Sequence, residues 1–235
     1  MVADHERRGR ESLGGTLFQK VCDAVSVERL QPFLRTCGGT LDHALRLYAW
    51  NIEISSAFHG PLHCLEVVLR NAMDRELTAL FQRSDWWNAP ALDLALHARQ
   101  SVTYACTTVA QNYAHPTNGH VIAELSFGFW TSLLGTGNRY DMRLWRPALH
   151  RAFPGYCGSR RALHQDLYHL RKLRNRIAHY EPIHQRHLAA DHTKILRILS
   201  HISPETTTWV RANDRVPEVL ARRADVCTAV APTRF

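Results

Sequence analysis

The stretch SRRALHQDLYHLRKLRNRIAHYEP, residues 159–182, carries the pattern of an amphipathic helix. Ser159 is a good N-cap for this helix, and Pro182 is expected to end it because proline and the residue before it disfavour helical backbone. At about 100° per residue, five apolar side chains fall on one side and predict the core face. They are Leu163, Leu167, Leu170, Leu173 and Ile177. The stretch therefore predicts a helix over 160–180 with one buried side.

Arg174 is an exception on this helix, because it projects into the apolar stripe. Burying an unpaired guanidinium costs roughly several kcal/mol of folding free energy. We therefore expect Arg174 to meet a carboxylate or to face an anion-binding cleft. Glu66 is the first candidate, since it projects into the apolar stripe of a helix expected over 61–82. Each of the two residues can equally find another partner.

A polar seam runs beside the core stripe of the helix. His164, Tyr168, Asn175 and His179 fall within about 60° of one another, and Asn175 and His179 are one turn apart. Such a seam suits a ligand or a second protein chain better than bulk water. The alternative is that His179 only complements the negative end of the helix dipole. The pattern alone leaves both open.

The rest of the chain is also predicted to be helical, and it lacks the alternating β-branched runs that mark strands. Caps, glycines and prolines predict the boundaries. Thr40 begins a helix that Gly60 closes, and Pro61 begins the next. Further helices are expected over 89–114, 120–135, 139–155 with a kink at Pro147, and 187–203, with short pieces over 204–213 and 216–223. We expect one all-α domain over 16–235 behind a disordered basic tail at 1–15.

Composition narrows the class of protein. The hydrophobic fraction of 45% and the charged fraction of 21% are ordinary for a folded protein. No run of 18 apolar residues exists, so no membrane span or membrane partner is expected, and the polar N-terminus lacks the apolar segment of a signal peptide. A cytoplasmic location is the expectation. The six cysteines show no CxxC pair and are expected to be reduced, buried small hydrophobes.

The net charge of +8 comes from 29 lysines and arginines against 21 acidic residues, and the basic side chains are nearly all arginine. Arginine is the better bidentate partner for phosphate, which favours a nucleic acid as partner. A basic surface that only maintains solubility explains the same charge.

Two further groups of residues favour structural explanations. His184, His187 and His192 follow the helix, but their spacing does not match a metal site, so surface histidines and no cofactor are expected. The aromatic segment FGFW, residues 127–130, and the pair Trp86 and Trp87 are expected to pack in the core rather than to stack on bases.

The motif Arg174-Asn175-Arg176-Ile177-Ala178-His179 near a helix end, with a proline soon after, resembles the signature of HEPN-domain ribonucleases. The blocks ALRLYAWNIEISSAF, LEVVLRNAMDREL, ELSFGFWTSLL and LRKLRNRIAHYEPI are together similar to the Abi-like branch of this superfamily, which is linked to abortive infection and toxin–antitoxin systems. The resemblance covers roughly residues 40–200. It implies an HEPN-like helical bundle, here with extra flanking helices.

The resemblance also implies a function. It implies a metal-independent endoribonuclease toxin that cleaves RNA through attack by the 2′-hydroxyl and needs no cofactor. The enzyme is then expected to be a homodimer with a composite site. A cognate antitoxin is a further candidate partner. The catalytic residues it implies are Arg174, Asn175 and His179. Candidate supporting side chains are Glu66, Arg70, Asn71, His164, Tyr168, Arg171 and Arg176. The resemblance does not extend to Arg171 and Arg176, which are also explained as solvated surface charges. The alternative is a catalytically inert HEPN module that binds nucleic acid, a nucleotide or a protein partner.

Overall fold

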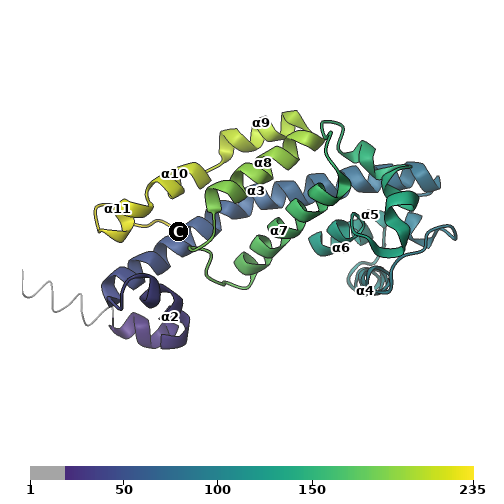
Figure 1. Cartoon of the computed structure of the whole chain (residues 1–235). Helices are drawn as coiled ribbons and strands as arrows, with labels where there is room; N and C mark the ends of the chain where they lie inside the picture. Colours follow the sequence, from purple (N-terminus) through teal and green to yellow (C-terminus); the bar gives the residue numbers. More distant parts are fainter. Residues whose placement is uncertain (1–18) are drawn as a thin grey trace, which may run out of the picture. The chain divides into compact units, whose positions relative to one another are not determined.

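The structure is a computed structural model, and it describes residues 19–235. All regular elements of this described part are helical, which confirms the predicted all-α class (Figure 1). The longer helices are α2 (Val27–Thr36), α3 (Leu41–Phe81), α4 (Leu96–Asn112), α5 (Asn118–Glu124), α6 (Phe127–Ser132), α7 (Arg160–Ala178), α8 (Leu188–Ile202), α9 (Pro204–Asn213), α10 (Val216–Ala221) and α11 (Arg223–Cys227). Short 3₁₀ and π turns cover Trp86–Asn88 and parts of 137–152. The tail expected at 1–15 lies outside the described residues.

The chain divides into two compact units. The first holds the described residues up to Phe58, together with Glu181–Leu188 and Arg215–Phe235. The second holds His59–Tyr180 and Ala189–Asp214. The expected single domain over 16–235 stays a prediction. The motif helix α7 lies entirely in the second unit.

Helix α3 contributes to both units and corrects one prediction. It continues from Leu41 to Phe81 with Pro61 inside it, so the boundary predicted at Gly60 and Pro61 is wrong. A proline removes one backbone hydrogen bond from a helix interior. Buried residues on α3 just before and just after Pro61, Phe58 and Leu62, keep the helix packed within each unit. Packing therefore outweighs the local signal of the Gly-Pro pair.

In the first unit, a small apolar core joins residues 19–25, α2 and the start of α3. Its buried members are Cys22, Leu30 and Leu45. The amide of Asn51 on α3 holds the segment that follows the motif, because its Oδ1 accepts the backbone N–H groups of Ile183 and His184 at 2.8 and 3.1 Å. This segment of the chain is thereby fixed to α3 by a buried side chain.

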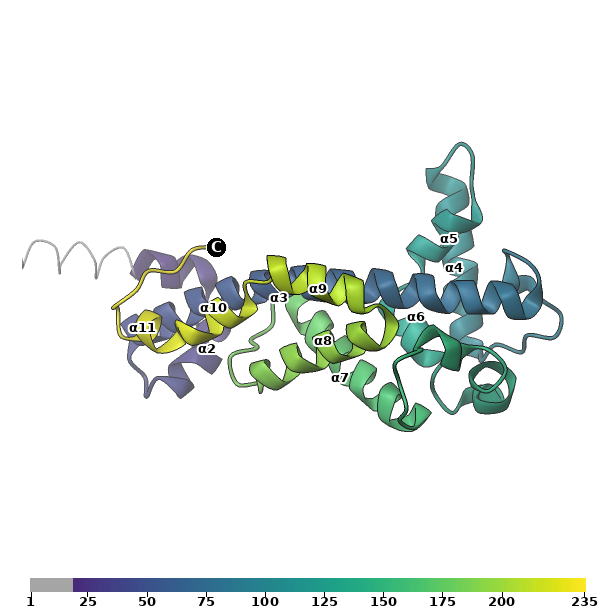
Figure 2. The same cartoon turned by 90° about the horizontal axis from the view of Figure 1, so that it is seen from above.

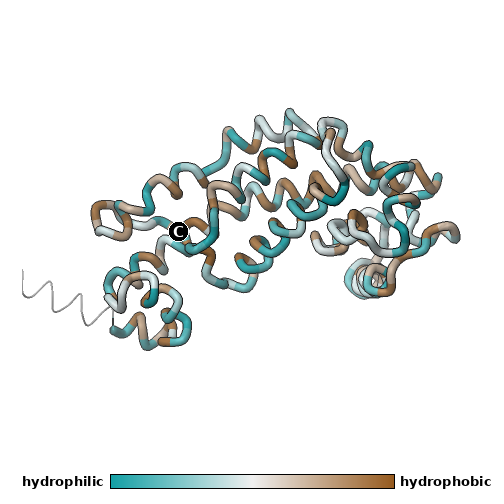
Figure 3. The backbone as a smooth tube through the Cα atoms, viewed as in Figure 1, coloured by the Kyte–Doolittle hydropathy of each residue, from teal (hydrophilic) through white to brown (hydrophobic). Residues whose placement is uncertain are grey.

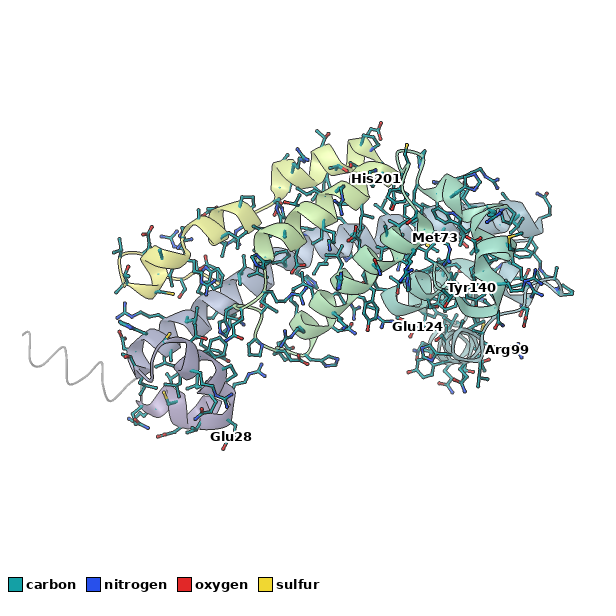
Figure 4. All side chains as sticks on the ribbon, viewed as in Figure 1. Glu28, Met73, Arg99, Glu124, Tyr140 and His201 are labelled. Carbon is teal, nitrogen blue, oxygen red and sulfur yellow. The ribbon has the colours of Figure 1, made fainter. Side chains whose placement is uncertain are left out.

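The core of the second unit is rich in aromatic residues. Trp86, Phe129 and Trp130 are fully buried and pack ring against ring, as predicted for the FGFW segment and the tryptophan pair. Each indole N–H has a partner, Asp74 for Trp86 and the Leu125 carbonyl for Trp130. The labelled Met73 and Tyr140 in Figure 4 belong to the same interior and are 0% and 2% exposed.

The helix expected over 120–135 is replaced by two short ones, α5 and α6. Leu125 and Ser126 have extended backbone between them, and the Ser126 hydroxyl accepts the N–H of Phe129 as the N-cap of α6. The prediction missed this break because apolar residues recur at helical spacing on both sides of it. Helix α4 likewise begins at Leu96, later than the predicted residue 89.

Helix α7 matches its prediction closely. The Ser159 hydroxyl caps it by accepting the N–H of Ala162, and its leucines at 163, 167, 170 and 173 are fully buried. Helix α8 lies beside it in both views (Figures 1 and 2), where Asp166 of α7 pairs with Lys194 and Arg197 of α8 at 2.9 and 2.7 Å. Figure 3 shows the polar character of α7, with hydrophilic positions recurring along its length.

The cysteines depart from their prediction. All six are free, but only Cys22 is buried, and Cys157 is exposed in the loop before α7. The remaining four are half-buried. Among the described helices, none is both long enough and apolar enough to cross a membrane.

Candidate functional site

Arg174 of α7 and Glu66 of α3 form an ion pair, with 3.4 Å between Nε and Oε2. The side chain of Glu66 is 20% exposed and that of Arg174 is 41% exposed. The predicted pairing of these two residues is therefore confirmed, although Arg174 lies at the edge of the apolar stripe rather than inside it. Its half-exposed position lowers the cost of keeping the guanidinium charged.

The second oxygen of Glu66 is also occupied. Oε1 accepts the backbone N–H of Phe127 at 3.0 Å, at the first turn of α6. This N–H has no acceptor within α6, because the first amides of a helix lack an intrahelical partner. One carboxylate therefore ties α3 to both α6 and α7, and it fixes the position of the Arg174 side chain.

The ion pair leaves the terminal nitrogens of Arg174 available. Within the described part of the chain, the contact with Glu66 is the only polar partner of this side chain. Arginine carries N–H donors on both terminal nitrogens in addition to Nε. The terminal N–H groups of Arg174 can thus donate to an anion while Glu66 contacts Nε.

Asn175 and His179 are both exposed, one turn apart at the end of α7. His179 is the C-cap, and its backbone N–H donates to the Asn175 carbonyl at 2.9 Å. Tyr180 then adopts a left-handed backbone with φ of 56°, which is uncommon for a residue other than glycine and stops the helix before Pro182. The imidazole is accordingly presented at a helix terminus and in contact with solvent.

The polar seam is graded in exposure. His164 is half-buried, and burial, followed by the charges of Arg160 and Arg171, lowers its pKa. Tyr168 is 37% exposed, with the Arg171 guanidinium 5.0 Å and the Lys172 ammonium 4.6 Å from its ring centroid. Within the seam, the half-buried imidazole of His164 lies toward the start of α7, and the three exposed residues lie toward its end.

The other residues expected to support the site differ in their contacts and in their exposure. Arg171 packs against α6, since a Cβ on Gly128 would lie 3.5 Å from its side chain, and its Nε is buried without a hydrogen-bond partner. Arg70, one turn after Glu66 on α3, donates to the Ala123 carbonyl at 3.3 Å. Asn71 is exposed and Arg176 is half-buried.

The histidines after the motif do not all match the surface location expected for them. His184 is 1% exposed, stacks on Phe33 at 4.6 Å and lies 3.0 Å from the Thr36 hydroxyl. The imidazole of His192 is hydrogen-bonded to the Asp214 carboxylate. The surface prediction is wrong for His184 because the backbone contact with Asn51 draws its segment inward. Within residues 19–235, no group of three His, Cys, Asp or Glu side chains is arranged to hold a metal ion.

Two structural partners of the site were not predicted from the sequence. The Phe127 amide could not be found because the α5–α6 break was not predicted, although Ser126 is a good N-cap and signals it. Asn51 binds the backbone of the segment that follows the motif. The only sign of this role in the sequence is a polar residue on an apolar helix face. Comparisons of the chain with protein-family models, with curated proteins and with solved structures found no match.

Proposed function

We propose that this chain is a metal-independent endoribonuclease of the HEPN type, in the Abi-like branch, acting as a toxin in an abortive-infection or toxin–antitoxin system. The observation that carries the proposal is the position of Arg174, whose Nε is held by Glu66 five residues before the exposed His179. This combination supplies an oriented cation and an accessible imidazole at one end of one helix.

The reaction needs three functions. A base removes the proton of the substrate's 2′-hydroxyl, the oxygen attacks the adjacent phosphorus, and a cation stabilises the negative charge that builds on the phosphoryl oxygens. The bond from phosphorus to the 5′-oxygen then breaks, and an acid protonates that oxygen. The products are a 2′,3′-cyclic phosphate and a 5′-hydroxyl, with no net gain or loss of protons.

The motif residues fit these functions. His179 transfers the proton, because an imidazole exchanges protons near neutral pH. Arg174 stabilises the phosphoryl charge through its terminal N–H groups, and it does not deprotonate. Asn175 orients the imidazole or donates to a phosphoryl oxygen. Glu66 is a positioning residue, since it contacts Arg174 and not the reacting atoms.

A dimer follows from the same chemistry. The attacking and leaving oxygens lie on opposite sides of the phosphorus, so one imidazole cannot serve both at once. Each chain contributes one motif histidine, and a second copy supplies the other. The resemblance implies the same composite site. We propose in addition that RNA is the substrate and that the chain acts in the cytoplasm.

The competing candidate is an inert HEPN module that only binds. The intact Arg174-Asn175-x3-His179 motif favours the enzyme, because an inert module need not keep the histidine. Induced expression in bacteria separates the two. Wild-type protein arrests growth if it is the toxin, and His179→Ala restores growth at equal protein level. Equal growth of both strains would favour the inert module.

A further inference from the structure

The segment from Gln100 to Ala123 contains no Asp, Glu, Lys or Arg, although 21% of the whole chain is charged. Arg99 and Glu124, which Figure 4 labels, bound this segment. It forms most of α4 and of α5, which project to one side of α3 in Figure 2. A solvated helix face normally carries charge, so an exposed helix face without charge is typical of a surface that another protein covers.

Helix α4 buries one side and exposes the other. The buried side chains are Ala98, Val102, Ala105 and Val109. On the opposite side lie four exposed residues that fall within about 60° of one another and are here named the neutral seam. They are Gln100, Tyr104, Thr107 and Gln111. The exposed side of α4 is therefore polar or aromatic along this line, but not charged.

The neutral seam can be covered at low cost. The Thr107 hydroxyl already donates to the Thr103 carbonyl at 2.9 Å within the same helix, so burial leaves no unsatisfied hydroxyl donor there. Tyr104 is 69% exposed and offers a large ring for contact. Tyrosine is enriched in protein interfaces, whereas charged residues are depleted at their centres. Nucleic-acid binding instead relies on Lys and Arg that neutralise phosphates, and the seam has neither.

The order of the four residues indicates which protein fits. Their spacing of four, three and four residues is the same when read in either direction. If two copies of α4 lie antiparallel, Gln100 faces the partner's Gln111, and Tyr104 faces the partner's Thr107. An amide carries both a donor and an acceptor, so the two glutamines can pair at each end. A surface that matches itself under a two-fold rotation is what a symmetric dimer contact requires.

Charge favours a second copy as well. Two copies of a chain with a net charge of +8 repel each other wherever basic surfaces meet, and the neutral seam sets no like charges against each other. We infer that two copies of this chain associate through the neutral seam, with their α4 helices antiparallel. The contact lies outside the motif helix, and the inference does not rest on the proposed function.

Paired substitutions at the two glutamines test both the contact and its direction on the full chain. Gln100→Lys with Gln111→Lys sets lysine against lysine at both ends of the antiparallel contact, whereas Gln100→Lys with Gln111→Glu sets lysine against glutamate. The first variant should raise the dissociation constant by at least about tenfold, because like charges in contact repel, and should halve the molar mass in light scattering at micromolar concentration. The second variant should keep the wild-type mass. Circular dichroism checks that both keep their helical content.

Thr107→Arg has a matched control in Thr208→Arg. Thr208 is exposed on α9 in the same unit, and its hydroxyl donates to the Pro204 carbonyl at 3.1 Å, as that of Thr107 does to the Thr103 carbonyl. Thr107→Arg should halve the molar mass, because it places two like charges near the centre of the contact. Thr208→Arg should leave the mass unchanged.

Three results would overturn the inference. They are a wild-type chain with the mass of one copy, an unchanged mass in the lysine–lysine variant, and equal losses in the lysine–lysine and lysine–glutamate variants. The last result is expected for parallel helices, in which each glutamine meets its own counterpart. RNA cleavage is measured separately. A chain that associates through the neutral seam and cleaves no RNA would support this inference and remove the proposed function.

Discussion

Glu66 and Arg174 lie 3.4 Å apart, and the same carboxylate accepts the Phe127 N–H at 3.0 Å. These contacts join three helices of the second unit at a single side chain. They leave the terminal nitrogens of Arg174 to serve an anion. In this account the pair is a positioning device, and its removal should change the chemistry more than the fold.

Glu66→Gln tests this role. The glutamine oxygen can still accept the Phe127 N–H, but the charge that holds Arg174 is lost. We expect the turnover rate on RNA to fall by about 10- to 100-fold, because a small displacement of a positioned group is enough for such a loss. RNA affinity should change little, and circular dichroism should show the same helical content.

Glu76→Gln is the matched control for that experiment. Glu76 lies on the same helix, is 18% exposed and pairs with Arg151 at 2.8 Å, away from the motif. It should retain full activity. Equal losses of activity in the two variants would indicate a general effect of neutralising α3 and not a specific effect on Arg174.

The sequence predicts most of α7 and the pairing of Glu66 with Arg174. The regular leucine spacing fixes the buried side of the helix, and two opposite charges that each project into an apolar stripe need partners. Periodicity could not predict how far the Arg174 side chain is buried. Arg174 is at the edge of its stripe, and a shift of one position around a helix is within the scatter of such patterns.

Helix boundaries were predicted less well, for opposite reasons at two places. At Pro61 the local signal for a break is strong, and packing on α3 overrides it. At Leu125 and Ser126 the helical spacing of apolar residues hides a break that depends on one N-cap hydrogen bond and on the tertiary contact from Glu66. The partner of the Phe127 amide was therefore not predictable from periodicity.

His164 gives a prediction for pH. Burial, and then the charges of Arg160 and Arg171, lower its pKa in the folded state. The unfolded chain then binds the proton at a higher pH than the folded chain does, so stability is lost as the pH falls below about 6.5 toward the lowered pKa. His164→Gln removes this loss. Thermal unfolding should show wild type losing stability relative to the variant between about pH 7 and about pH 5. A constant difference over this range would contradict the prediction.

Glu53 and Glu218 give a matched pair for stability, because both face Arg222 in the first unit. Glu53 is 1% exposed and lies 3.1 Å from Arg222, whereas Glu218 is 64% exposed and 3.6 Å away. Glu53→Ala should cost about 3 kcal/mol of unfolding free energy, because it breaks a largely buried ion pair. Glu218→Ala should cost less than about 1 kcal/mol. Urea unfolding of both variants checks this, and equal costs would contradict it.

Association of two copies tests the composite site. Light scattering on the His179→Ala chain should show a dimer at micromolar concentration, because each chain supplies one motif histidine. A monomer under these conditions would contradict the composite site.

Cleavage of RNA by the purified chain in the presence of EDTA is the decisive measurement. We expect products that end in a 2′,3′-cyclic phosphate, a loss of about 10²–10⁴-fold in rate for His179→Ala, and an unchanged rate for His97→Ala, an exposed histidine of α4 in the same unit. Cleavage that stops with EDTA and returns with added metal would contradict the 2′-hydroxyl mechanism, and equal rates for wild type and His179→Ala would contradict the assigned site.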